Sequence, residues 1–548
     1  MHLEPLFGES QFQPERRVAG PGWTKPEAPG ELLPYWRIEG WDDLGEEELF
    51  DKRAEVADVL LETGVAESVF PVPCADLALR PPDSAREPVS AADAARTPTP
   101  DLRDRQGYLD DRGVNLWSVR HLPGATGSGV RIVDIEGAWC LEHEDLLQNA
   151  RGVMAGQPLD SDRRMRNHGT AVMGVLGADT NEFGTTGICP DAIISALSVF
   201  GLRGGAAAAI RIAADSLARG DIVLVELHQP GPLHKFLTRG RDQDGYVPVE
   251  FFPDTFAAIR YATARGVIVV EAAGNGGQQL DDPFYDEVPA GFPPTWTNPF
   301  NPRVRNYAGS GAVLVGAGAP PGGGAAEPAS SRMVFSNWGE RVDAHGWGNG
   351  VATTGGYWTG EGDLAGGPDE TRWYTSRFSG TSSAAPMVAG ALACVQGVLR
   401  ASGHTPLTPE QARRALRETG PEQASAEGRP ATERIGRRPD IRALIDWALK
   451  ETPRSETTRR RRRPMRVQIT IDDGGDNDGV VVSSGDSANR ERNGGAPWNP
   501  QWRGPFFLMS ANEAAELGVP GAVEIVESGL AGNPREAGPQ DTPEPEKD

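Results

Sequence analysis

The chain has 548 residues, a length that predicts one large domain of about 300 residues with smaller attachments. Its 54 Lys and Arg against 77 Asp and Glu give a net charge of −23. Phosphate binding needs clustered basic side chains, so this balance argues against nucleic acid as the main partner. The one basic run, residues 459–463, is interpreted as a solvated linker because like charges repel each other.

Residues 1–17 lack the basic start and the apolar run of a secretory signal. No apolar segment approaches the roughly 20 residues that span a bilayer. We therefore expect a cytoplasmic protein with no membrane partner. The 4 cysteines lie far apart without a CxxC pair, so neither a zinc site nor a disulfide framework is predicted. Nothing in the sequence indicates the oligomeric state.

In chain order, residues 1–73 are expected to form a small α+β segment. The stretches "YWRIEGW" and "VAESVFPVP" are interpreted as strands, and residues 46–64 between them have helical spacing closed by Gly64. Residues 74–106 are rich in Pro, Ala and charged side chains, which is typical of a linker.

Residues 107–450 show a different pattern, in which short apolar runs alternate with helical stretches. The expected strands are "GVRIVDIE", "DIVLVEL", "GVIVVEAAGN" and "GAVLVGAG". The expected helices are "HGTAVMGVLGA", "GAAAAIRIAADSLARG", "DTFAAIRYATARG" and "SSAAPMVAGALACVQGVLR". This alternation predicts an α/β domain with a mostly parallel central sheet and helices on both faces, and a functional site at the carboxyl ends of the strands.

The sequence also predicts the structure at the end of this domain and in the segment that follows it. The helix "LTPEQARRALRETG" has Thr408 as its N-cap, Pro409 in its first turn and Gly420 past its end. Residues 451–548 are expected to form a largely irregular extension, with a strand in "RVQITIDDGG", a short helix in "SANEAAELG" and an acidic disordered tail.

Four polar residues of this domain occupy the ends of expected elements. Asp134 ends "GVRIVD", His168 opens the helical stretch "HGTAVMG", and Asn275 follows "VIVVEAAG". Ser382 starts a helix of small residues, where unpaired backbone N–H groups can stabilise negative charge. Each residue alone is common in caps and turns. Together they supply an orienting carboxylate, a base, an oxyanion donor and a nucleophile.

The order of these residues, with the flanks "IVD", "HEDL", "NHGT", "VVEAAGN" and "FSGTSSAAPMVAG", resembles the subtilisin-like serine peptidase family over about residues 107–450. The resemblance implies a three-layer fold and a serine endopeptidase that acts on a protein or peptide and needs no cofactor for catalysis. It makes Ser382 the nucleophile, His168 the base and Asp134 the residue that orients the imidazole, with Asn275 and the Ser382 N–H binding the oxyanion. The alternative is a catalytically silent subtilisin-like module that only binds peptides.

The sequence departs from the family pattern at the acid and along the substrate channel. The family has Asp-Ser-Gly or Asp-Thr-Gly at the acid, whereas "DIEGAW" places Glu136 two residues after Asp134. Glu136 could add to the negative field near His168, but we expect it to face solvent where the strand ends. The glycines of the family's "SLGG" strand become His228 and Gln229, which predicts a restricted specificity. The predicted substrate-binding residues are Glu226, Leu227, His228, Gln229, Ala272, Ala273 and Gly274, and the insertion 231–253 is expected to wall the cleft.

Two further features are implied by the resemblance. Asp145 and Asn181 fall where many family members bind a structural calcium, although the same residues are common in turns, and both interpretations stay open. Residues 1–73 resemble the family's inhibitory propeptide, with 74–106 as a cleavable connection. The alternative, which we favour, is a docking or strand-completing segment that stays attached.

Overall fold

The computed structural model describes residues 2–5, 36–39, 60, 68–70, 72, 75–78, 98–148, 150–238, 243–322, 324, 326–454, 467–470 and 481–484. It divides the chain into two units, Met1–Pro453 and Arg454–Asp548. In the first unit β1 (His2–Pro5) pairs antiparallel with β2 (Trp36–Glu39), which confirms the strand expected at 35–41. In the second unit β15 (Val467–Thr470) pairs antiparallel with β16 (Val481–Ser484), and the first of these confirms the expected strand.

The other strand and the two helices expected near the ends of the chain are not confirmed. Residues 68–70 and 72 have no regular structure, so the strand expected at 65–73 is not found where the chain is described. The helix expected at 46–64, apart from Leu60, and the helix expected at 510–518 lie outside the described residues.

The centre of the first unit is a seven-stranded sheet in which every pair of neighbours is parallel. Six of its strands are almost entirely buried, as expected for a parallel sheet with helices on both faces, whereas the edge strand β5 exposes Val153 and Met154. The spatial order is β12 (Ala344–Trp347), β11 (Val313–Gly318), β10 (Ile268–Ala272), β7 (Ile222–Val225), β4 (Arg131–Glu136), β6 (Ile193–Ser198) and β5 (Ala150–Ala155).

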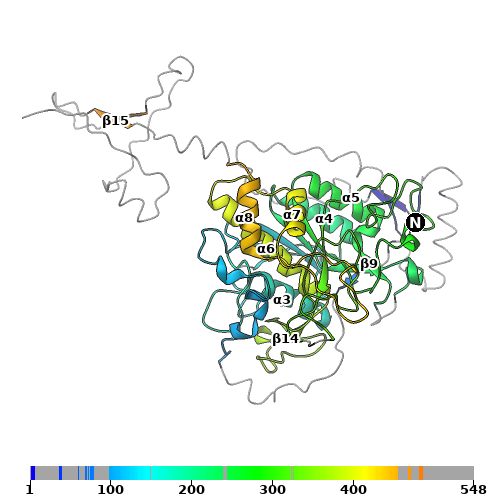
Figure 1. Cartoon of the computed structure of the whole chain (residues 1–548), viewed down its shortest axis with the longest axis horizontal. Coiled ribbons are helices and arrows are strands. Elements are labelled where there is room, and N and C mark those ends of the chain that lie inside the picture. Colours follow the sequence, from blue (N-terminus) through cyan, green and yellow to red (C-terminus); the bar gives the residue numbers. More distant parts are fainter. Residues whose placement is uncertain are drawn as a thin grey trace, which may run out of the picture. The chain divides into compact units, whose positions relative to one another are not determined.

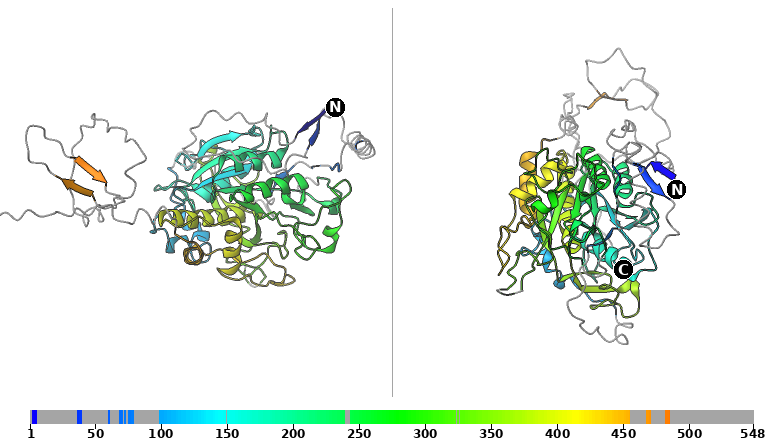
Figure 2. Two further views of the ribbon diagram at one scale, coloured as in Figure 1. Left: turned by 90° about the horizontal axis from the view of Figure 1, so that it is seen from above. Right: turned by 90° about the vertical axis from the view of Figure 1, so that its right-hand side faces the viewer.

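Helices cover both faces of this sheet (Figure 1 and Figure 2). α4 (Gly205–Ser216) and α5 (Pro253–Ala264) pack against each other on one face. α6 (Thr381–Ala401) crosses β10, β11 and β12 on the other face and packs against α3 (Arg163–Gly177). The predicted three-layer α/β architecture with a mostly parallel sheet is therefore confirmed.

The central helix α6 corrects one expectation from the sequence. Its 21 residues are long and apolar enough to cross a membrane by length and composition, although its most apolar stretch is completely buried in the fold. Small residues are needed for that packing. A Cβ on Gly397 would lie 2.1 Å from the Gly124 carbonyl oxygen, and one on Gly390 would lie 2.9 Å from Ile188.

The remaining elements frame the sheet. α7 (Pro409–Glu418) begins with a capping box between Thr408 and Gln411, which confirms the predicted cap, and α8 (Ile441–Glu451) follows it. Three of the cysteines, Cys140, Cys189 and Cys394, are free. The short strands are β3 (Asp76–Leu77), β8 (Leu227–Pro230), β9 (Tyr246–Pro248), β13 (Val351–Thr354) and β14 (Tyr374–Phe378). The 3-10 helices are Arg103–Arg105, Gly107–Leu109, Leu116–Ser118, Pro232–His234, Val249–Phe251, Pro283–Asp286 and Glu370–Arg372.

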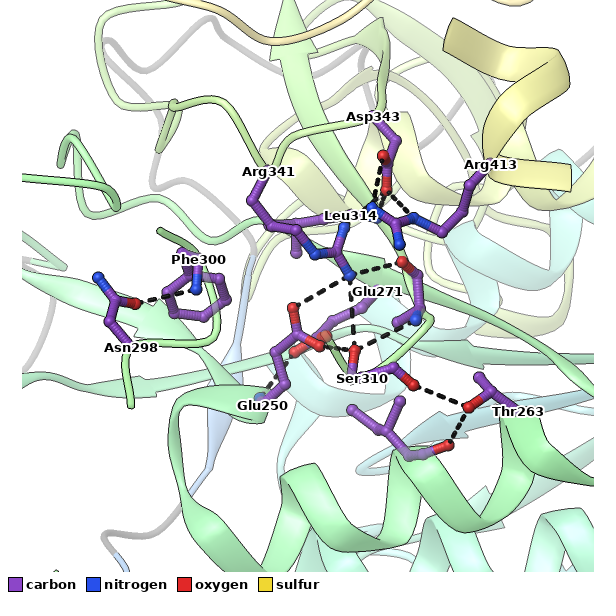
Figure 3. Close-up of polar contacts among 12 residues, drawn as sticks. Glu250, Thr263, Glu271, Asn298, Phe300, Ser310, Leu314, Arg341, Asp343 and Arg413 are labelled. Atoms are coloured by element: carbon purple, nitrogen blue, oxygen red, sulfur yellow. Dashed lines mark hydrogen bonds and ion pairs between the residues drawn. The ribbon is translucent and has the colours of Figure 1, made fainter. Parts of the chain in front are cut away.

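A buried cluster of charges lies beside β10 and β11 (Figure 3). Arg341 is 1% exposed and forms ion pairs with Asp343 at 2.7 Å and Glu250 at 3.4 Å. Arg413 of α7 also pairs with Asp343, at 3.1 Å. Ser310 donates a hydrogen bond to Glu250. The cluster ties α7 to the sheet through pairs of opposite charge, which is how buried charges are tolerated.

Candidate active site

The polar residues singled out in the sequence meet at the carboxyl edge of the sheet. β4, β7 and β10 are neighbours, and they end at Glu136, Val225 and Ala272. His168 reaches this edge from α3, and Ser382 from the start of α6. In open α/β sheets this edge is where ligands bind.

The carboxylate beside the histidine is Glu136, which corrects the expectation for Asp134. A carboxylate oxygen of Glu136 lies 2.7 Å from His168 Nδ1, and both side chains are completely buried. Asp134 instead accepts a hydrogen bond of 2.8 Å from the indole N–H of Trp139. The two carboxylates share a face of β4 because residues two apart on a strand do so. Glu136, at the end of the strand, therefore faces the imidazole and not solvent.

His168 lies inside α3 and does not open it as expected. The helix begins at Arg163, and its N-cap Asp162 accepts a hydrogen bond of 2.8 Å from the Arg164 N–H. Burial, together with the charge of Arg164, lowers the pKa of His168 to about 3. The imidazole is therefore neutral at neutral pH, as a general base must be before it accepts a proton.

Three buried carboxyl groups lie near one another at this edge: Asp134, Glu136 and Glu226. Burial raises the pKa of each well above its ordinary value. The charge of Glu136 raises the pKa of Asp134 further, and the charges of both raise that of Glu226. The Ser382 hydroxyl offsets part of the rise at Glu226, although the two side chains do not reach hydrogen-bond geometry. Burial therefore disfavours the accumulation of negative charge at this edge of the sheet.

Ser382 is the second residue of α6, directly after the turn that starts the helix. The N-cap of α6, Gly380, has a φ of 103°, in the range that favours glycine. Ser382 Oγ is completely buried. Within the described part of the chain, neither this oxygen nor His168 Nε2 has a hydrogen-bond partner. Both atoms can thus bond to a substrate.

Asn275 is fixed beside Ser382 through the residue that precedes the serine. Its Oδ1 accepts hydrogen bonds from the Thr381 N–H at 2.9 Å and from Thr381 Oγ1 at 3.0 Å. This turns the amide nitrogen of Asn275 toward the cleft, where it donates to Gln243 Oε1 at 3.1 Å. Gln243 belongs to the insertion 231–253, and it was not predicted as a site residue because nothing in its local sequence marks it.

The expected linker supplies a strand to the cleft. β3 (Asp76–Leu77) pairs antiparallel with β8 (Leu227–Pro230), in a register that puts Asp76 opposite His228. β9 pairs with the other edge of β8, so that β8 is the middle strand of a three-stranded sheet. A part of residues 74–106 is thus built into the fold beside the predicted substrate-binding strand.

The next residue, Ala78, brings its carbonyl group to the serine. The Ala78 N–H donates to the Glu226 carbonyl oxygen at 3.3 Å, and the Ala78 carbonyl oxygen accepts from the Ser382 N–H at 3.4 Å. Gln243 Nε2 donates to the Leu77 carbonyl oxygen at 2.9 Å. A carbonyl oxygen bonded to the backbone N–H of Ser382 lies where the expected nucleophile would meet the carbonyl of a substrate. The chain's own segment therefore lies in the cleft as a peptide substrate would.

His228 stands at the centre of the predicted substrate channel. Its Nδ1 accepts a hydrogen bond of 3.2 Å from the Asn275 N–H, and its ring lies 4.7 Å from the ring of Tyr246. Burial lowers its pKa to about 3, so it is neutral. The other predicted channel residues are buried around it: Glu226, Leu227, Gln229, Ala272, Ala273 and Gly274.

Asp145 and Asn181 meet as hydrogen-bond partners, in an arrangement that does not fit a cation. Asn181 Nδ2 donates to Asp145 Oδ1 at 2.7 Å, and the Thr185 N–H donates to Oδ2 at 2.8 Å. Asn181 Oδ1 is turned away, because it accepts from the Phe183 N–H. Burial raises the pKa of Asp145 to about 7. A calcium site needs several oxygens facing the ion, and no group of three His, Cys, Asp or Glu side chains suited to a metal occurs among the described residues.

Comparison with known proteins decides the family. The model of the subtilase family (peptidase S8) matches residues 141–436, more than half of the chain. The chain belongs to the subtilase family. It is a serine-type endopeptidase, and its substrates are proteins or peptides. The matched region contains His168, Asn275 and Ser382 but begins after both β4 carboxylates, so the choice between those two rests on geometry.

Individual relatives agree with this family. Subtilisin BL of Lederbergia lenta is 29% identical over 278 residues, which cover 50% of this chain and 79% of that protein. An intracellular serine protease of Paenibacillus polymyxa is 26% identical over 322 residues, covering 57% and 80%. Among solved structures, a protease of Pseudoalteromonas arctica covers 64% of this chain and 99% of its own, with 20% identity and a TM-score of 0.43. The patellamide maturation protease PatA covers 59% and 98%, with 20% identity and a TM-score of 0.39.

Proposed function

We propose that this peptidase uses Ser382 as its nucleophile, His168 as the general base and Glu136 as the carboxylate that orients the imidazole. The observation that carries the proposal is the 2.7 Å contact between Glu136 and His168 Nδ1, beside a serine N–H that already binds a peptide carbonyl. Glu136 thus takes the role that the resemblance gave to Asp134.

In this assignment His168 Nε2 takes the proton of Ser382 Oγ as the oxygen attacks the carbonyl carbon, and later gives it to the leaving amine. Glu136 keeps the other imidazole proton on Nδ1 and stabilises the charged imidazolium. The Ser382 N–H and Asn275 Nδ2 donate to the oxyanion. Nδ2 must leave Gln243 for this, and loss of such a side-chain donor costs about 100- to 1000-fold in kcat in subtilisin.

We further propose that the first substrate of the site is its own chain. The bond presented to Ser382 is the one between Ala78 and Leu79, because Ala78 supplies the bound carbonyl. Attack would form an ester between Ser382 and Ala78 and release the amine of Leu79, and water would then hydrolyse the ester. Until that happens the segment excludes other peptides. The contact supports a propeptide-like role over a segment that stays attached.

A restricted specificity is part of the same proposal. β8 carries His228 where the family pattern has a glycine, and this side chain is completely buried against the backbone of Asn275. The insertion contributes Gln243, which contacts both the bound segment and Asn275. Side chains that fill a channel restrict what it accepts, so the cleft should discriminate among peptides.

The test is labelling of Ser382 by a fluorophosphonate probe, read as intact mass, in the wild type, Ser382→Ala and Ala78→Pro. Proline at position 78 removes the N–H that bonds Glu226, so the segment should leave the cleft. We expect one adduct, formed faster on Ala78→Pro than on the wild type, and none on Ser382→Ala.

The same samples separate the alternatives. Loss of the residues up to Ala78 from the wild type but not from Ser382→Ala would support self-cleavage at the proposed bond. A folded Ala78→Pro protein that gains no adduct would refute the catalytic assignment, and a peptide-binding module would then be the better description.

A further inference from the structure

We propose that the cleft selects peptides with a small residue directly before the cleaved bond and an acidic residue two positions earlier. The inference rests on the proposed function and names its substrate class. Counted back from the bond, Ala78 is the first residue of the bound segment, Leu77 the second and Asp76 the third. The contacts of these residues define a substrate pattern with an acidic third residue, any second residue and a small first residue.

The register of the segment decides which side chains face each other. Asp76 lies opposite His228, and residues opposite each other in an antiparallel pair project from the same face. Residues two apart on a strand also share a face, so Ala78 projects on the side of His228 and Glu226. Leu77 projects to the other face. The first and third residues of a bound peptide are therefore read on the face that carries His228.

The space around the first residue is already filled. Ala78 and His228 are both 0% exposed. His228 is fixed by the Asn275 N–H at 3.2 Å and by the ring of Tyr246, and a Cβ on Gly274 would lie 3.3 Å from His228 Cβ. Ala78 lies opposite Glu226 and diagonal to His228 on the same face, so a side chain longer than a methyl group would have to displace these buried neighbours. This placement explains how a bulky residue can replace glycine in the channel: the bound residue is small.

The third residue is held by a cation. Arg164 lies 3.2 Å from Asp76 Oδ1, and the two side chains are 23% and 18% exposed. The guanidinium of Arg164 stacks over Trp358, 5.5 Å from the ring centre, and Asp162 lies 3.8 Å away on its own helix. An acidic third residue forms a partly buried ion pair with Arg164, whereas a basic one would bring like charges together.

The experiment uses the full-length Ala78→Pro protein and the peptide Ala-Asp-Leu-Ala-Leu-Arg, which is the sequence of residues 75–80. Phe in place of the second Ala should lower kcat/KM by about 100-fold, in the range expected for misfits in a filled pocket. Lys in place of Asp should lower kcat/KM by about 5-fold or more, as expected for a partly exposed ion pair. The second effect should shrink at high salt because the pair is partly screened.

Matched variants assign each preference to its residue. His228→Gly should restore cleavage of the Phe peptide, whereas His228→Gln keeps a comparable volume and an acceptor for the Asn275 N–H and should still reject it. Arg164→Glu should reverse the preference between Asp and Lys. The control is Arg163→Glu, which makes the same charge change one residue earlier, where the guanidinium lies over Trp373. That variant should keep the preference for Asp.

The outcomes separate the inference from the proposed function. Equal cleavage of all peptides by a protein that the probe labels would overturn the inference and leave the function standing. Preference for Lys at the first position would point to Glu226 as the selecting group and would also overturn it, as would failure to cleave the segment's own sequence. Absence of both labelling and cleavage would refute the function itself.

Discussion

Substitution of the two β4 carboxylates should have opposite results. Asp134 and Glu136 are both 0% exposed and lie two residues apart on one strand, so Asp134→Asn and Glu136→Gln replace a buried carboxyl group with an amide of the same size at nearly the same place. Only Glu136 contacts the imidazole. Asp134→Asn keeps an oxygen that can accept the Trp139 N–H, so the hydrogen bond of Asp134 survives the substitution.

The magnitude follows from the tautomer that each variant permits. In Glu136→Gln the new side-chain amide would present an N–H to His168 Nδ1 and move the imidazole proton to Nε2, which then cannot accept the serine proton. In a trypsin-like triad the same change lowers kcat by about 10⁴-fold, or roughly 5 kcal/mol of transition-state stabilisation. Asp134→Asn should cost less than about tenfold, which is under 1.4 kcal/mol.

The assay is kcat/KM on the peptide of residues 75–80, with each substitution placed in the Ala78→Pro background so that the cleft is open. The rate of fluorophosphonate labelling gives a second readout that does not depend on peptide binding. Circular dichroism confirms that each variant is folded. A protein inactivated by Asp134→Asn but active with Glu136→Gln would refute the assignment made from the 2.7 Å contact.

Three predictions concern stability. Arg341→Met should cost about 3–5 kcal/mol in urea unfolding because it leaves Glu250 buried without its guanidinium, and a smaller loss would contradict this. Burial opposes ionisation of Asp343, yet three arginines hold its pKa well below its ordinary value. The stability that this ionised group contributes is present above about pH 4 and is lost as the pH falls further. The free energy of unfolding of Asp343→Asn should therefore fall less steeply with decreasing pH than that of the wild type. Chelators should leave the Tm unchanged, because Asp145 and Asn181 bond to each other. A fall in the Tm would show instead that these residues bind calcium.

The sequence predicts the elements that carry a strong local signal. β7 and β11 are continuous apolar runs and β4 and β10 are apolar runs interrupted by acidic residues; these strands and the helices that cover them were expected. β5, β6 and β12 were not predicted. "ARGVMA" and "AHGW" have neither an apolar run nor regular alternation, whereas "IISALS" of β6 is apolar and was missed all the same. β12 is fully buried only because α6 and β11 pack against it. Burial of that kind arises from neighbours far along the chain, and local composition does not record it.

The residues of the candidate site were likewise predicted only where the local sequence is distinctive. His168, Asn275 and Ser382 lie in distinctive motifs, and the structure brings all three to one edge of the sheet. The two carboxylates of β4 share a face, so strand alternation cannot tell which one meets the imidazole. Ala78 was read as part of a linker because a two-residue strand has no periodicity. Its role follows from pairing with β8, about 150 residues later in the chain.

Self-cleavage would also change how firmly the segment is held. While it is part of the chain its effective concentration at the cleft is on the order of millimolar, so weak peptides cannot displace it. Cleavage after Ala78 removes that advantage and places a new carboxylate near Glu226, where burial and the charges of Glu136 and Asp134 already disfavour negative charge. Release of the cleaved segment should therefore be faster at alkaline pH, where these groups lose protons, than at acid pH. Dissociation measured after a pH jump tests this; a rate independent of pH would show that hydrogen bonds and Leu77, and not charge, hold the product.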